Sequence, residues 1–117
     1  MILHADKVVE VVEKYAESEP VIFAGDFNTT PDKPYYSNLT KSLSSAYKTF
    51  NKTEPKQTCR AHPSYSKDMF SDCIDYVFYN GLEVVSVEQL EESEELMPNK
   101  NEPSDHLLLS AKFKFIY

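Results

Sequence analysis

The chain has 117 residues, of which 41% are hydrophobic, 26% charged and 13% aromatic, and its formal net charge is -7 at pH 7. This composition predicts one small globular domain over residues 1–117 and excludes a disordered chain. No apolar run approaches the roughly 20 residues of a membrane-spanning helix, and the N-terminus lacks the basic and apolar regions of a signal peptide. We therefore expect a cytoplasmic protein that does not contact a membrane.

The negative charge bears on binding to nucleic acids. Proteins that bind nucleic acid without specificity usually neutralise its phosphates with a basic face, which this composition does not favour. A phosphodiester substrate is still compatible with the charge in two ways. Carboxylates can hold a divalent cation that meets the phosphate, or a basic surface can be supplied by another chain.

The first third of the chain predicts a helix, a strand and a second helix. Residues 6–15 place apolar side chains three and four positions apart, at Val8, Val12 and Tyr15, as in an amphipathic helix. Residues 21–24 are apolar and predict a buried strand, which Gly25 ends. A loop with two prolines follows, and Pro34 suits the first turn of a short helix over residues 34–39.

The middle of the chain has weaker patterns. Residues 51–56 are polar and predicted to be exposed, residues 57–60 predict a short strand or bend, and residues 62–71 predict a long loop. The two cysteines, Cys59 and Cys73, form no C-x-x-C pair and are expected to be free thiols. A zinc site of Cys59, His62 and Cys73 is an alternative, although it has no fourth ligand at a regular spacing.

The last third predicts three strands. Residues 74–79 and 82–88 flank Asn80-Gly81, the strongest short signal for a hairpin, so we expect these two strands to pair antiparallel. Acidic residues 88–95 predict a solvated face or loop, and residues 98–103 a second loop. Residues 107–115 predict a final strand with one apolar face, formed by Leu109, Ala111, Phe113 and Phe115.

Polar groups stand at three predicted strand ends. Asp26 and Asn28 follow the first strand, and in an extended chain their spacing points both side chains to the same side. Asp75 is the second residue of the strand predicted over residues 74–79, and Asp105 and His106 precede the last strand. Each has a structural alternative: an Asp/Asn turn after the first strand, a satisfied polar group at Asp75 and a turn cap at Asp105.

Together these positions form three short motifs in a fixed order. The motifs are Gly25-Asp26-Phe27-Asn28, Ile74-Asp75-Tyr76-Val77 and Ser104-Asp105-His106. Their order and spacing resemble the C-terminal motifs of the endonuclease/exonuclease/phosphatase superfamily. Within it, the deadenylase branch of nocturnin-like, Angel-like and 2',5'-phosphodiesterase-like proteins is most similar at residues 31–36, at Ser45-Ala46-Tyr47 and at residues 103–107. The resemblance implies an α+β fold: the C-terminal half of a deoxyribonuclease-I-like four-layer α/β sandwich, with a mainly antiparallel sheet and flanking helices.

The resemblance also implies an activity, namely Mg2+-dependent hydrolysis of phosphodiester bonds by in-line attack of water, as in an RNA 3'-exonuclease that removes poly(A). Asp26 would orient or deprotonate the water, and Asn28 would hydrogen-bond a phosphoryl oxygen. His106 would donate to the phosphate, Asp75 would hold and charge the imidazole, and Asp105 would steady the metal side of the site. Poly(A), a 2',5'-linked oligonucleotide and a small phosphorylated molecule all remain possible substrates.

The resemblance covers only the second half of the superfamily's domain. The magnesium-binding Glu of the superfamily, an Asn and a first-half His lie upstream of the motifs present here, and relatives often carry Thr followed by Asn or Trp where this chain has Thr58-Cys59. We therefore expect weak Mg2+ binding, little activity from the chain alone, and self-association or pairing with an N-terminal half. The alternatives are an inactive fragment that acts as a binding or structural module, and an unrelated α+β domain with chance motifs.

Overall fold

A computed structural model describes residues 2–61, 70–91, 97 and 104–116. The described residues form three helices, α1 (Ile2–Ala16), α2 (Pro34–Leu39) and α3 (Ala46–Asn51). They also form seven strands: β1 (Val21–Asp26), β2 (Ser44–Ser45), β3 (Cys59–Ala61), β4 (Phe70–Asp72), β5 (Asp75–Asn80), β6 (Leu82–Val87) and β7 (Ala111–Phe115). The loop predicted over residues 98–103 lies outside the described residues, as does most of the loop predicted over 62–71.

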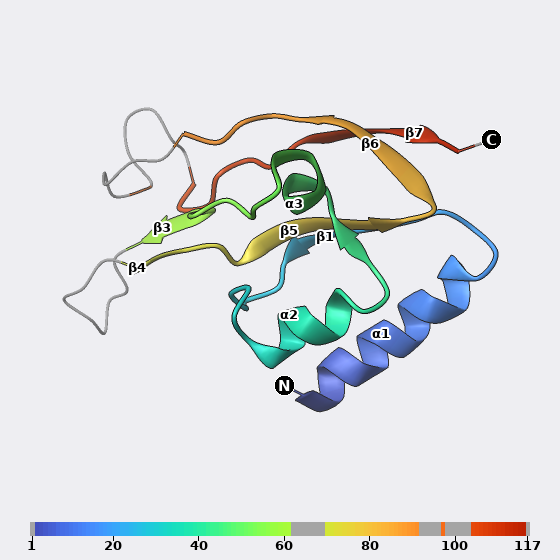
Figure 1. Cartoon of the computed structure of the whole chain (residues 1–117). Helices are drawn as coiled ribbons and strands as arrows, with labels where there is room; N and C mark the ends of the chain where they lie inside the picture. The colour runs from blue at the N-terminus through green and yellow to red at the C-terminus, as the bar shows by residue number, and fades with distance from the viewer. Residues whose placement is uncertain (1, 62–69, 92–96, 98–103, 117) are drawn as a thin grey trace.

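The strands form a layered, entirely antiparallel arrangement. Strand β5 lies in the centre of a three-stranded sheet of order β1-β5-β2, β6 pairs with β7, and β3 pairs with β4. Helices α1 and α2 cover one face of the β1-β5-β2 sheet, and the β6-β7 pair lies over the other face with α3 between them (Figure 1). This arrangement agrees with the α+β class predicted from the sequence.

Alternate side chains of β5 pack into two hydrophobic cores, one on each face of the β1-β5-β2 sheet. Tyr76 and Phe78 face the helices, where the buried cluster also contains Val12, Phe27, Tyr36, Leu39, Leu43 and Cys73. Val77 and Tyr79 face the other way and pack with the cluster under β6 and β7, which contains Ala46, Tyr47, Val87, Leu109, Ala111 and Phe113. A central strand whose two faces are both buried is apolar along most of its length, as the sequence of β5 is.

The hairpin predicted at Asn80-Gly81 is wrong. Strands β5 and β6 belong to different sheets, because β1 and β2 already occupy both edges of β5. Gly81 has φ +76°, in the region that favours glycine, and it turns the chain out of the first sheet and into the second. There β6 pairs with β7, with Leu82 opposite Phe115.

Other differences concern element boundaries and exposure. Helix α1 begins at Ile2 rather than at residue 6, and Tyr15 is 59% exposed instead of facing the core. Helix α3 was not predicted, and the last strand begins at Ala111 rather than at residue 107. Residues 70–71 of the predicted loop belong to β4. The stretch 51–56 is not wholly exposed, because Glu54 accepts hydrogen bonds from Tyr36 and Ser45.

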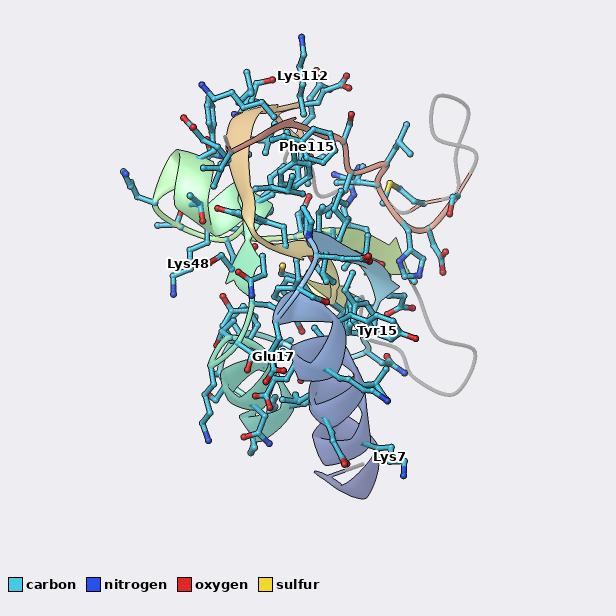
Figure 2. The ribbon with its side chains drawn as sticks, turned by 90° about the vertical axis from the view of Figure 1, so that its right-hand side faces the viewer. Lys7, Tyr15, Glu17, Lys48, Lys112 and Phe115 are labelled. Atoms are coloured by element: carbon cyan, nitrogen blue, oxygen red, sulfur yellow. The ribbon has the colours of Figure 1, made fainter. Side chains whose placement is uncertain are left out.

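Strand β1 is half exposed rather than buried, and this exposure defines one side of the molecule. Ile22 is 55% exposed and borders an apolar groove with Pro20, Leu82, Phe113 and Phe115. We call this groove the open apolar side. It lies between the edge strands β1 and β7, and Figure 2 views the molecule from there, with Tyr15 on α1 below and Phe115 on β7 above.

None of the helices in the described part of the chain combines the length and the apolar character needed to cross a membrane.

Candidate functional site

Three segments of the chain meet at one end of the β1-β5-β2 sheet. The antiparallel register of β1 and β5 places Asp26, the last residue of β1, opposite Asp75, the first residue of β5. His106 reaches the same place through a single β-bridge to Cys59 at the start of β3. Residues separated by up to 80 positions in the sequence therefore share one strand end.

His106 lies between a buried carboxylate and two exposed ones. Its Nδ1 atom is 2.9 Å and 3.1 Å from the two carboxylate oxygens of Asp75, whose side chain is only 12% exposed. Its Nε2 atom is 3.9 Å from Oδ2 of Asp26 and 3.7 Å from Oδ1 of Asp105. The structure thus brings four of the five predicted site residues together, and their roles remain predictions.

The same neighbours change the protonation of His106. Burial lowers the pKa of the imidazole, but the hydrogen bond to Asp75 and the negative charges of Asp75, Asp105 and Asp26 raise it by more. The net effect is a pKa above the ordinary value of 6.5. At neutral pH, His106 is therefore protonated to a larger fraction than a histidine with the ordinary pKa, and its Nδ1–H donates to Asp75.

Asn28, the fifth predicted residue, lies on a turn beside the cluster. Its backbone N–H donates to Oδ1 of Asp26 at 2.8 Å, and its φ of +54° is left-handed rather than extended. The prediction that Asp26 and Asn28 point to one side of an extended chain is therefore wrong, and the Asp/Asn turn forms instead. Within the described residues, no hydrogen bond joins the Asn28 side chain to His106. The hydroxyl of Tyr76 contacts this turn: it lies 2.7 Å from the carbonyl oxygen of Thr29 and 3.0 Å from that of Cys73, and it can donate its one proton to either.

Thr58 is a positioning residue that the sequence did not reveal. It is fully buried, and its Oγ1 accepts hydrogen bonds from the backbone N–H groups of Ile74 at 3.0 Å and Asp75 at 3.1 Å. Its carbonyl accepts the N–H of Leu107 at 2.7 Å. One threonine therefore joins the start of β5 to the segment that carries His106. No local sequence pattern predicts this role, because the hydrogen-bond partners of Thr58 are all distant in sequence.

Two groups of side chains in the described residues have ligand atoms within 4.8 Å of one another and could hold a metal ion. One contains Asp26, Asp75 and His106, and the other contains Cys59, Asp105 and His106. Cys73 belongs to neither group, and His62 lies outside the described residues, so the zinc set of Cys59, His62 and Cys73 stays a prediction. Burial and the surrounding carboxylates raise the pKa of the Cys59 thiol to about 11.

Comparison with known sequences gives a consistent set of matches. The model of the Endonuclease/Exonuclease/phosphatase family matches residues 2–106. The chain is similar to 2',5'-phosphodiesterase 12 of Homo sapiens, at 29% identity over 82% of this chain and 20% of that protein. It is also similar to nocturnin of Homo sapiens, at 33% identity over 82% of this chain and 25% of that protein. The chain thus spans a quarter or less of these relatives.

Comparison with solved structures gives the same picture of the fold. The catalytic domain of human nocturnin, solved with a bound sulfate anion, matches with a TM-score of 0.72 at 29% sequence identity. The match covers 96% of this chain and 40% of that domain. The fold is therefore that of the nocturnin catalytic domain, as the resemblance implied, and this chain corresponds to less than half of it.

Replacement of Thr58 by valine is expected to destabilise the fold. Valine keeps the shape of threonine but leaves the N–H groups of Ile74 and Asp75 without an acceptor, so T58V should lower the free energy of unfolding by about 1–3 kcal/mol. Urea unfolding followed by circular dichroism measures this loss. T58S retains the hydroxyl and is the control; equal stability of T58V and T58S would contradict the role of Oγ1.

Replacement of Asp75 by asparagine is expected to lower the pKa of His106. Because the pKa of His106 is raised in the folded chain, its protonation stabilises the fold. This stabilisation is complete below the pKa of about 6.5 in the unfolded chain and is lost as pH rises through the pKa in the folded chain. NMR titration of the imidazole protons measures the shift, with the His106 signal assigned from its loss in H106Q. E83Q, at a surface carboxylate paired with Lys114, is the control. An unchanged His106 pKa in D75N would contradict the proposed charge coupling.

Proposed function

The chain belongs to the Endonuclease/Exonuclease/phosphatase family, as its three motifs predicted, and we propose that it supplies the second half of a Mg2+-dependent phosphodiesterase site. Its family and relatives are those of a phosphodiesterase or nuclease-type hydrolase. The proposed reaction is hydrolysis of RNA from its 3' end, as in removal of poly(A). The observation that carries the proposal is the contact of His106 with buried Asp75, which leaves Nε2 facing Asp26 and Asp105.

His106 is assigned to the phosphate. Because Nδ1 is held by Asp75 at 2.9 Å, the ring cannot turn without losing a charge-assisted hydrogen bond. Its raised pKa favours the imidazolium, whose Nε2–H is then free to donate to a phosphoryl oxygen. A fixed donor directed at developing negative charge is among the larger contributions to catalysis.

Asp26 is assigned to the attacking water. One of its oxygens, Oδ1, accepts the N–H of Asn28, so the carboxylate has a defined orientation on the turn. The other oxygen, Oδ2, faces Nε2 of His106 at 3.9 Å, and the side chain is 47% exposed. An exposed, oriented carboxylate can align and deprotonate a water beside a phosphate that His106 holds. Asn28, two residues later, is assigned as a second donor to a phosphoryl oxygen.

The donor atoms present are compatible with Mg2+. Magnesium prefers oxygen ligands and is commonly held by one or two carboxylates, with water and substrate phosphate completing its shell. Asp26 and Asp105 each offer an exposed carboxylate beside His106, 47% and 45% exposed, but they belong to different groups of ligand atoms, so one ion would be held by one of them together with water and phosphate. When bound there, Mg2+ would neutralise charge on the phosphoryl oxygens. The resemblance assigns a further Glu to the upstream half, so we expect this chain alone to bind Mg2+ weakly.

Two observations support a phosphate-containing substrate. Relatives of this chain include a 2',5'-phosphodiesterase, and the nocturnin domain was solved with sulfate, a tetrahedral anion with the shape of phosphate. The net charge of -7 makes a long track of phosphate contacts on this chain unfavourable. It favours recognition of one phosphodiester near the end of a strand, in either a 3',5'- or a 2',5'-linked oligonucleotide.

A second function, that of a non-catalytic binding or structural module, is supported by the extent of the match. The chain corresponds to 40% of the nocturnin catalytic domain and to 20–25% of the curated relatives. In this alternative the residues around His106 retain their geometry and can hold a phosphate, but no water is activated beside it.

The open apolar side supports a partner for this chain. Strands β1 and β7 are both edge strands within the described residues, and Ile22 and Phe115 between them are 55% and 62% exposed. Free strand edges beside exposed apolar side chains favour addition of further strands. We propose that the part of the family's domain absent from this match packs there, and that a second copy of this chain occupies the same surface when the chain is alone.

We also propose a cytoplasmic location. Both cysteines are free and buried, and free thiols are the usual state in a reducing compartment.

A chimera tests the catalytic proposal. The part of the human nocturnin catalytic domain that this chain does not match is fused ahead of the chain and assayed with Mg2+ on 3',5'- and 2',5'-linked oligoadenylates. We expect hydrolysis by the chimera, a loss of roughly 100- to 10,000-fold in H106A, and little or no hydrolysis by the chain alone. E83Q on the distant strand β6 is the control and should retain the activity.

The outcomes separate the two functions. A folded chimera that is inactive but binds the oligonucleotide through His106 would favour the non-catalytic module. Hydrolysis by the chain alone that depends on His106 would show that the upstream half is dispensable.

Light scattering tests the partner proposal. We expect the chain alone to have a mass above 13.5 kDa that rises with concentration, because a second copy covers the open apolar side. I22K places a charge in this groove and should shift the chain toward monomer. V85K, at an exposed apolar residue of β6 that does not line the groove, should not. A monomer at every concentration would contradict the proposal.

A further inference from the structure

We propose that Cys59, Asp105 and Nε2 of His106 form a binding site for a thiol-preferring divalent metal ion such as Zn2+ or Cd2+, which shares Asp105 with the Mg2+ site proposed above. The three side chains come from two segments, the start of β3 and the residues before Leu107. Their ligand atoms all lie within 4.8 Å of one another.

The orientation of the His106 ring leaves Nε2 available to bind a metal ion. Histidines that bind metals usually donate their second ring nitrogen to a carboxylate, which fixes the ring and increases its basicity. Asp75 is that carboxylate here, at 2.9 Å from Nδ1 and largely buried. Nε2 is consequently the nitrogen that faces the exposed carboxylates of Asp26 and Asp105 and remains open to a metal ion.

The spacing of the nitrogen and oxygen ligands suits a small tetrahedral ion. Zinc bonds of about 2.0–2.3 Å to nitrogen, oxygen and sulfur place neighbouring ligand atoms roughly 3.3–3.8 Å apart. Nε2 of His106 is 3.7 Å from Oδ1 of Asp105, and Oδ2 of Asp26 lies only slightly farther away, at 3.9 Å. Asp26 belongs to the other group of ligand atoms, so water would take the fourth position.

The backbone holds the ligands in place without the ion. Cys59 and His106 are partners in a β-bridge, and the N–H of the next residue, Arg60, donates to the carbonyl of Asp105 at 2.9 Å. Both contacts join the strand that carries the thiol to the segment that carries the other two ligands. The ion would thus bind a largely preformed site and would not have to order a loop.

The donor set selects the class of metal. Sulfur and imidazole nitrogen favour zinc and cadmium, whereas magnesium favours oxygen alone. Three carboxylates, those of Asp26, Asp75 and Asp105, surround the imidazole, and a divalent cation offsets their mutual repulsion. On binding, the S–H bond of Cys59 and the Nε2–H bond of protonated His106 break, the metal–sulfur and metal–nitrogen bonds form, and the protons leave to the buffer.

Occupancy has a consequence that rests on the proposed function. Nε2 cannot bind a metal ion and donate a proton to a phosphoryl oxygen at the same time. Zinc should therefore inhibit hydrolysis by occupying His106, even when Mg2+ is in excess.

Cadmium titration of the chain tests the site directly. A cadmium–thiolate bond has an ultraviolet charge-transfer band, which we expect to grow to one equivalent in the unmodified chain. C59S should lose the band and bind cadmium roughly 10- to 100-fold more weakly, while D105N should keep the band and bind more weakly. C73S is the matched control, since it replaces the other buried free cysteine, and it should retain both the band and the affinity.

A second measurement covers the case in which C59S does not fold, as judged by circular dichroism. Addition of Zn2+ should shift the His106 ring signals in NMR spectra of the unmodified chain and of C73S. Unmoved His106 signals, a band that survives in C59S, or a band lost only in C73S would each overturn the site. Zinc binding by the active chimera without inhibition would overturn only the inhibitory role, whereas an inactive chimera leaves the binding result standing.

Discussion

The antiparallel pairing of β1 with β5 is the constraint on which the rest of the site depends. In this register Asp26 and Asp75 are directly opposite each other, so the end of one strand and the start of another form a single polar edge. The register is fixed because alternate residues of β5 fill two different cores. A slip of one residue would exchange the residues that face the two cores and separate the two carboxylates.

Three carboxylates surround the imidazole of His106, and they differ in how deeply they are buried. Asp75 is 12% exposed and touches Nδ1, so it orients and charges the ring. Asp26 and Asp105 are almost half exposed and face Nε2, where a substrate or cation can reach them. The residues are chemically alike, and only the packing around each decides which one holds the ring and which ones stay accessible to solvent. Thr58 fixes that packing, because it joins the start of β5 to the segment that carries His106.

The open apolar side and the proposed half site have a common origin. A sandwich that ends at β1 on one sheet and β7 on the other exposes the apolar residues that lie between its sheets, here Ile22 and Phe115. At the proposed metal site, the thiol of Cys59 changes which metal the cluster beside His106 prefers.

The sequence by itself determined the family, the α+β class and four of the residues that meet at the candidate site, because the motifs that contain them are short runs of neighbouring residues. It also determined most strands, since the alternation and apolar runs of β5, β6 and β7 are local properties. Only the tertiary structure decided how the strands pair. Asn80-Gly81 is a strong hairpin signal, yet both edges of β5 are taken by β1 and β2, strands distant in sequence. For the same reason Thr58 and the grouping of Cys59 with His106 could not be predicted: their partners are set by long-range packing, which no local pattern encodes.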